Sequence, residues 1–153
     1  MRIAHLQDRA VAVLSSRWIE GVALLMTRVA LAGIFWRAGR AKIAEGSLFE
    51  ISDATYYLFE YEYAGVPFSP AIAAPLATLG EHLFPALLAI GLATRLSALA
   101  LLVMTLVIQV FVYPDAWWST HIIWVALTAV LIVRGGGMLS LDAVIARWRR
   151  QGV

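Results

Sequence analysis

Four stretches of this chain are long and apolar enough to cross a lipid bilayer, and they constrain its fold more than any other feature. They cover residues 20–41, 70–92, 96–113 and 117–134. A hydrocarbon core about 30 Å thick requires roughly 20 apolar residues per helix. The sequence therefore predicts an all-α integral membrane protein, a four-helix bundle in which residues 1–153 form a single transmembrane domain.

Composition agrees with this class and excludes several others. The chain is 61% hydrophobic and only 14% charged, which is far more apolar than a soluble domain. It contains no cysteine, which excludes thiol redox chemistry, thiolate metal sites and haem attachment through cysteine. The net charge of +2 does not indicate a nucleic-acid partner, because the basic residues lie beside the apolar segments. The expected surroundings are a lipid bilayer.

The distribution of charge predicts that both termini are cytoplasmic. With the N-terminus inside, eight arginines fall on the cytoplasmic side: Arg2, Arg9, Arg17, Arg95, Arg134, Arg147, Arg149 and Arg150. Only Arg37, Arg40 and Lys42 lie toward the other side, where the loop 42–69 is acidic and aromatic. Positive residues concentrate on the cytoplasmic side of membrane proteins, so an N-in/C-in topology is predicted.

Both ends of the chain carry amphipathic segments. Residues 141–150, which follow Ser140, predict a short basic helix lying on the inner leaflet. Residues 1–17 carry apolar side chains at helical spacing between charges, and either an interfacial helix or a frayed tail explains them.

Glu81 is the most unusual residue, because it lies within an apolar run, where ionisable groups persist mainly when they are paired or functional. Counting about 1.5 Å per residue from the cytoplasmic ends places Glu81, Gln109 and His121 roughly 18 to 20 Å into the core. Arg28 and Arg37 lie nine residues apart, on opposite faces of one helix, so only one can face the bundle. Arg28 shares its face with small residues that favour close packing. We therefore expect an inward polar layer of Arg28, Glu81, Gln109 and His121, in which Arg28 pairs with Glu81.

Two neighbours of Glu81 add detail to this layer. Pro85 removes the hydrogen bond to the carbonyl of Glu81, so the helix is expected to kink there. His82 is turned about 100° away from Glu81 and is a secondary candidate, as are Lys42 and Arg37. A purely structural ion pair and a ligand-binding or proton-relay layer both explain the pattern. No metal site is predicted, because the histidines are far apart and lack a standard ligand spacing.

Several weak motifs, taken in order, resemble the DoxX family of small bacterial four-helix membrane proteins. They cover most of residues 22–145 and comprise Arg28, residues 33–42 (GIFWRAGRAK), Gly65-Val66-Pro67, the helix around Glu81 that ends in Gly91-Leu92-Ala93-Thr94-Arg95, His121 and residues 135–142. The family pattern matches Arg28, Gly39, Lys42, Glu81 and His121 residue by residue. Arg37 and Arg40 make this end of the helix more basic than the family pattern.

The resemblance implies a bacterial inner-membrane protein and leaves several functions open. The first is an accessory or scaffold subunit of a membrane complex linked to redox or metal stress, with a protein partner or a homo-oligomer. The second is a quinone-interacting oxidoreductase subunit, because relatives include the DoxD-type subunit of a thiosulfate:quinone oxidoreductase. A small transporter ranks last, since four helices are few for alternating access. Quinone is the only cofactor that these alternatives name, and whether the protein is an enzyme stays open.

Overall fold

The computed structural model describes residues 15–152, and this part of the chain is all-helical, as predicted. Four elements are long and apolar enough to cross a membrane: α2 (Arg17–Ala41), α4 (Pro70–Ile90), α5 (Thr94–Phe111) and the continuous segment Pro114–Arg134. That last segment begins with a 3-10 turn, η1 (Pro114–Ala116), and a π-helical turn, η2 (Trp117–His121), before α6 (Ile122–Arg134). Two shorter helices, α3 (Asp53–Tyr61) and α7 (Leu141–Gln151), complete the fold. The prediction for residues 1–17 falls largely outside the described residues.

Local chemistry explains where the helices begin and end. The side chains of Ser16, Ser52 and Ser140 accept a hydrogen bond from the backbone at the starts of α2, α3 and α7, as serine does at an N-cap. Gly91 ends α4 in the left-handed region at φ 72°, which glycine adopts without steric cost. The predicted C-terminal amphipathic helix is present as α7.

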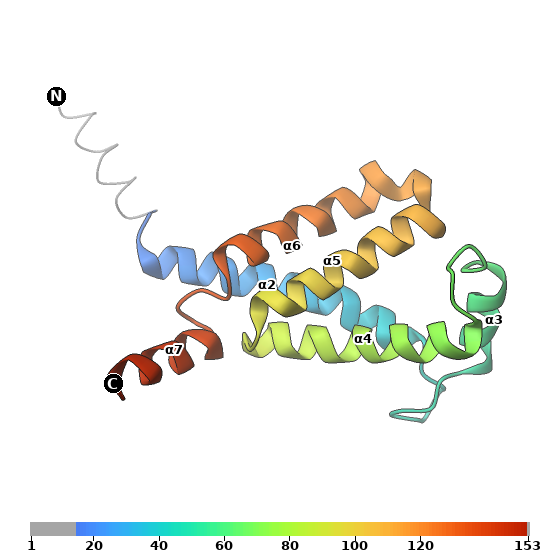
Figure 1. The fold of residues 1–153 in the computed structure, drawn as a ribbon, viewed down its shortest axis with the longest axis horizontal. Coiled ribbons are helices and arrows are strands. Elements are labelled where there is room, and N and C mark those ends of the chain that lie inside the picture. Colours follow the sequence, from blue (N-terminus) through green and yellow to red (C-terminus); the bar gives the residue numbers. More distant parts are fainter. Residues whose placement is uncertain (1–14, 153) are drawn as a thin grey trace.

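The long helices pack as neighbours in the order α2, α4, α5 and α6, and α6 also contacts α2 (Figure 1). Their core is apolar and includes Leu24, Leu31, Phe35, Leu88, Leu101 and Leu131. Large apolar side chains also cover the outside of the bundle, among them Met26, Leu79, Val103 and Val133. An apolar exterior around four such helices suits a hydrocarbon environment.

Helices α2 and α4 are staggered along their length, so their ends are not level. Gly39, near the end of α2, packs against Glu81 and His82 in the middle of α4. The first half of α4 therefore runs past the end of α2 and packs instead against α3, where Phe59 joins Ala73 and Ala74 in a second small core. Helix α3 lies within the segment 42–69 that the sequence predicted only as a loop.

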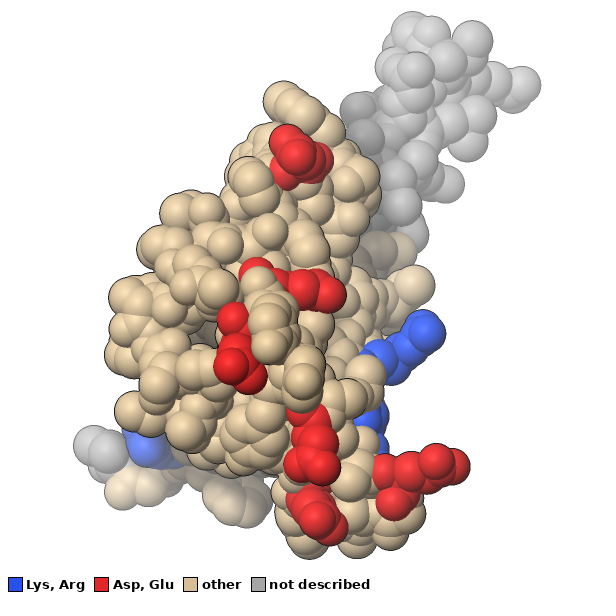
Figure 2. Space-filling model, turned by 90° about the vertical axis from the view of Figure 1, so that its right-hand side faces the viewer, with Lys and Arg blue, Asp and Glu red and all other residues tan. Residues whose placement is uncertain are grey.

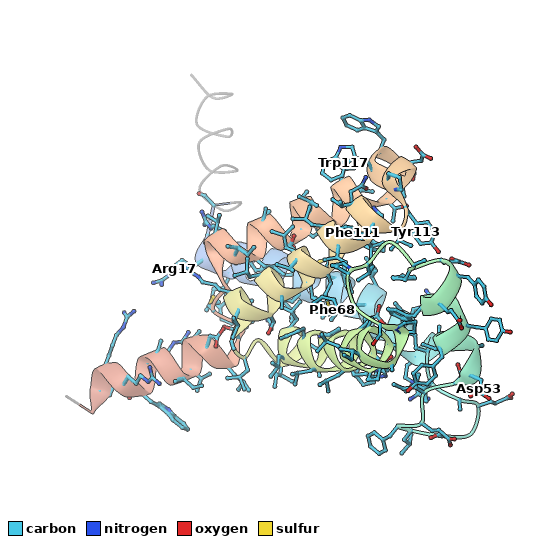
Figure 3. The ribbon with its side chains drawn as sticks, turned by 45° about the vertical axis from the view of Figure 1, so that its right-hand side comes forward. Arg17, Asp53, Phe68, Phe111, Tyr113 and Trp117 are labelled. Carbon is cyan, nitrogen blue, oxygen red and sulfur yellow. The ribbon has the colours of Figure 1, made fainter. Side chains whose placement is uncertain are left out.

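The two ends of the bundle carry opposite charge. We call them the α3 end, formed by α3 and the loops beside it, and the α7 end, formed by the start of α2, the α4–α5 turn and α7. Figure 2 shows acidic side chains gathered on the α3 end, where Glu45, Glu50, Asp53, Glu60, Glu62 and Asp115 are exposed. Figure 3 shows Asp53 at this end and Arg17 at the opposite one. Arginines dominate the α7 end.

Candidate functional site: a buried ion pair beside an apolar cavity

Lys42 and Glu81 form a buried ion pair between the end of α2 and the middle of α4. The Lys42 Nζ lies 2.9 Å from Glu81 Oε1 and 2.7 Å from Oε2. The two side chains are only 10% and 4% exposed, so little water reaches the pair. Charges removed from water in this way are tolerated mainly when they are paired.

The backbone around Lys42 fixes the position of its ammonium group. Lys42 is the residue at which α2 ends, and its own carbonyl accepts hydrogen bonds from Thr55 Oγ1 (2.9 Å) and from the Ser52 amide (3.1 Å). The start of α3 is thus tied to the end of α2. This connection lets the lysine side chain turn toward α4.

The Lys42 ammonium lies close to both oxygens of the Glu81 carboxylate. Although Glu81 Oε2 is close to the ammonium, it accepts no hydrogen bond of good geometry from the described residues and is fully buried. A buried carboxylate oxygen without a hydrogen bond is costly unless another donor reaches it. The ammonium at 2.7 Å compensates the charge of Oε2, and this oxygen keeps a lone pair that can accept from a further donor.

An apolar cavity of about 570 Å³ lies against this pair, between α4 and α5. Its walls are almost entirely apolar, and among residues 15–152 only Lys42 and Glu81 bring a charge to its lining. Phe59, Tyr63 and Phe68 line it from the α3 end, and Figure 3 shows Phe68 directed toward the two helices. Apolar walls with a few fixed polar groups are typical of small-molecule sites.

Tyr63 supplies the remaining polar group of the cavity wall. Burial raises the pKa of its phenol, and the nearby charge of Glu81 raises it further. The tyrosine is therefore neutral at ordinary pH and keeps its hydroxyl proton as a donor.

His82 faces α2 rather than the cavity. Its Nδ1 lies 2.7 Å from the carbonyl of Thr78, which can only accept, so Nδ1 carries a proton. Its ring also makes an edge contact with Trp36, with centroids 5.1 Å apart. The Nε2 is buried and has no hydrogen-bond partner within residues 15–152.

Gln109 and His121 form a second, separate polar pair at the junction of α5 and η2. The Gln109 amide nitrogen donates to the carbonyl of Pro114 at 2.6 Å, which leaves its oxygen to accept from His121 Nδ1 at 2.7 Å. Neither residue lines the cavity. The structure thus separates Gln109 and His121 from Glu81, which pairs instead with Lys42, a secondary candidate outside the predicted layer.

The predicted contact between Arg28 and Glu81 is wrong. Arg28 is fully buried, as expected of an inward-facing residue, but it donates to the carbonyls of Leu88 (3.1 Å), Ala89 (3.2 Å) and Leu139 (2.6 Å). It therefore joins α2 to the end of α4 and to the segment before α7. The prediction assumed that the helices end level, whereas their stagger places Arg28 beside the last turn of α4.

Arg37 is exposed, and Pro85 is buried within a helix that continues through it to Ile90, so the expected kink stays a prediction. Among residues 15–152 no group of three or more histidine, aspartate or glutamate side chains is placed to hold a metal ion.

Lys42 was only a secondary candidate in the sequence, although a signal for its role was present. It lies three residues after Gly39 and fourteen after Arg28, which keeps all three on one face of a helix. Gly39 packs against Glu81, so the next residue on that face is the one that can reach the carboxylate.

Comparison with known proteins identifies relatives for most of this chain. The family model described as DoxX matches residues 23–114. An uncharacterized protein of Haemophilus influenzae is 31% identical over 136 residues, which cover 84% of this chain and 86% of that protein. No solved structure matches.

Proposed function

This chain belongs to the DoxX family, and we propose that it is a membrane subunit that binds a lipid-soluble quinone in the cavity between α4 and α5. The observation that carries this proposal is the Lys42–Glu81 pair, which forms the charged part of an otherwise apolar cavity wall. The four apolar helices make it a multi-pass membrane protein. We place it in the bacterial inner membrane with the basic α7 end in the cytoplasm, following the positive-inside rule.

The residues present fit a quinone in size and in chemistry. The cavity of about 570 Å³ lies within the usual range for small-molecule sites, and its walls suit an apolar ring with an isoprenoid tail. The Lys42 ammonium can donate to a ring carbonyl, and Tyr63 offers a second donor. A remaining lone pair of Glu81 Oε2, beside the ammonium, can accept from a ring hydroxyl. A bound quinone would supply the exchange of two electrons and two protons.

The cavity also has a route from the membrane. Leu76, Leu79, Leu83, Leu96, Leu99 and Val103 line it and are exposed on the outside of the bundle. A ligand dissolved in the hydrocarbon can therefore enter between α4 and α5 without crossing a polar surface.

Binding of a short-chain benzoquinone analogue to the protein in nanodiscs tests the proposal. Val103→Trp places a large ring in the cavity wall, whereas Val110→Trp adds the same ring to an exposed position of α5 outside the cavity. We expect saturable quenching of tryptophan fluorescence, from which a dissociation constant follows. Val103→Trp should weaken the affinity for the analogue at least tenfold, and Val110→Trp should leave the affinity unchanged. Absence of saturable binding, or equal affinity in both variants, would contradict it.

A partner protein would supply or receive the electrons, which makes this chain an accessory subunit. The feature that favours such a partner is the α3 end, where Phe49, Tyr57 and Tyr61 are exposed beside acidic residues. Purification in mild detergent should then recover a second protein in stoichiometric amount. If Tyr57→Ser/Tyr61→Ser loses this second protein and Trp148→Ser at the other end retains it, the contact lies on α3.

A further inference from the structure

A second cavity, of about 1,160 Å³, opens at the α7 end of the bundle. It lies between the start of α2, the α4–α5 turn, the end of α6 and α7, so four separate segments of the chain meet around it. Five arginines line it: Arg17, Arg95, Arg134, Arg147 and Arg150. Within the described part of the chain two carboxylates also line it, Glu20 and Asp142.

Both carboxylates are already engaged, which leaves the cavity with an excess of positive charge. Glu20 forms an ion pair with Arg134. Asp142 accepts from the amides of Ala93 (2.8 Å) and Thr94 (2.9 Å) and so caps the start of α5. Arg95 donates to the carbonyl of Val133 at 3.1 Å.

Three of the five arginines have no such partner. Within residues 15–152, Arg17, Arg147 and Arg150 line this cavity without a hydrogen bond or an ion pair. They come from α2 and α7, at opposite ends of the described chain. These three exposed arginines border one cavity, and arginine binds a phosphate through two parallel hydrogen bonds, so they are suitable ligands for such a group.

The backbone of residues 135–137 adds to this site. Gly135, Gly136 and Gly137 form part of the wall, and Gly135 and Gly137 have φ values of 74° and 73°. The amides of Gly136 and Gly137 donate no backbone hydrogen bond within the described part of the chain. Unpaired amides beside arginines are further donors for an anion.

The apolar groups around the cavity indicate that the anion belongs to a lipid. Trp18 and Leu96 line the cavity and are 63% and 64% exposed on membrane-spanning helices. Helix α7 exposes three apolar side chains at helical spacing, Leu141, Val144 and Trp148, in addition to its arginines. A helix with apolar and basic side chains of this kind is typical of the membrane interface. If the phosphate of a phospholipid lay in this cavity, its acyl chains could contact the apolar side chains around it.

We propose that this cavity binds the phosphate of an anionic membrane phospholipid such as phosphatidylglycerol, held by Arg17, Arg147 and Arg150. The lipid would fill the space between α7 and the bundle and fix α7 in the inner leaflet. This proposal does not depend on the quinone cavity, which lies between α4 and α5 toward the other end.

Native mass spectrometry of the detergent-solubilised protein, titrated with phosphatidylglycerol or phosphatidylcholine, tests it. The variant Arg147→Gln/Arg150→Gln removes two of the ligands, and Arg149→Gln is the matched control because Arg149 is exposed on the same helix but does not line the cavity. An arginine near an anionic lipid contributes on the order of 1 kcal/mol, or about fivefold in affinity. The double variant should therefore bind phosphatidylglycerol about 25-fold more weakly, and Arg149→Gln should bind it as the unchanged protein does.

Three results would overturn the proposal. They are equal binding of both lipids, an equal loss of binding in Arg149→Gln, and displacement of the lipid by millimolar inorganic phosphate, which would indicate a site for a free anion. If the double variant melts at a lower temperature, Arg17→Gln on α2 provides an independent test. That variant should lose about fivefold in affinity for phosphatidylglycerol at an unchanged melting temperature.

Discussion

Lys42, the residue at which α2 ends, reaches Glu81 in the middle of α4 and lies within 2.7 Å of its Oε2. The pair joins two helices that the stagger of the bundle brings together only over part of their length. Because both charges are buried, each depends on the other for its stability. The same contact also fixes the polar groups of the cavity wall.

Removing one member of this pair should destabilise the protein more than removing both. Lys42→Met leaves the Glu81 carboxylate buried without its partner, and Glu81→Leu leaves the ammonium in the same position. Each change should lower the free energy of unfolding by about 3 to 5 kcal/mol, whereas Lys42→Met/Glu81→Leu should recover most of that loss. Unfolding by SDS in mixed micelles measures all three variants. Additive losses in the double variant would show that the two charges do not stabilise each other.

Arg28 should be irreplaceable by lysine even though the charge is kept. Its guanidinium reaches three carbonyls in two segments, and a single ammonium, which lacks the planar fork of two NH2 groups, cannot reproduce that geometry. Arg28→Lys should lower the free energy of unfolding by about 1.5 to 3 kcal/mol. Arg37→Lys on the exposed side of the same helix should change it by less than about 0.5 kcal/mol. A similar small effect of both substitutions would argue against the role of the three carbonyls.

Tyr113 should make the protein sensitive to alkaline pH. Its hydroxyl donates to Glu62, and this hydrogen bond, together with burial and the charge of Glu62, raises the pKa of Tyr113 above the usual value. In the unfolded chain the pKa of tyrosine is about 10. At that pH the Tyr113 hydroxyl of the folded protein is still mostly protonated, because its pKa is higher. The stabilisation is therefore complete below about pH 10 and is lost as the pH rises through the folded pKa.

The measurement is the free energy of unfolding of Tyr113→Phe and of the unchanged protein between about pH 8 and 11. The difference between them should shrink as the pH rises. Some alkaline loss should remain in the variant, because burial also raises the pKa of Tyr63. Curves that stay parallel over this range would exclude a contribution from the Tyr113–Glu62 contact.

The fold was predictable because each long helix is recorded in the sequence as an apolar segment of sufficient length. Helix α3 was not, since its nine residues lie among aromatic and acidic side chains that also suit an interfacial loop. It forms because Ser52 caps it and because Phe59 has the first half of α4 to pack against. That surface exists only once α4 has run past the end of α2.

Of the four residues predicted to form one polar layer, only Glu81 lines the cavity, and its partner is Lys42 rather than Arg28. Helix periodicity favoured Arg28 over Arg37 as the inward-facing arginine, and Arg28 is buried, because that inference requires only the turn per residue. Which buried residues meet depends on how far one helix slides along another, and the sequence does not record that displacement. Because α2 and α4 are displaced along each other, Arg28 lies beside the last turn of α4, and Lys42 contacts Glu81.

The close approach of α2 to α4 should make alanine substitution at Gly39 destabilising and alanine substitution at Gly33 harmless. A Cβ at Gly39 would lie 2.9 Å from the His82 ring and 3.0 Å from the Cβ of Glu81, whereas a Cβ at Gly33 would meet nothing within 4 Å. Gly39→Ala should therefore push α2 away from α4 and cost about 1 to 3 kcal/mol of unfolding free energy. Gly33→Ala should be neutral or stabilise the helix by up to about 1 kcal/mol, since alanine is the better helix former. Unfolding of the two variants under the same conditions provides the comparison, and an equal response would mean that the α2–α4 contact does not depend on a missing side chain at Gly39.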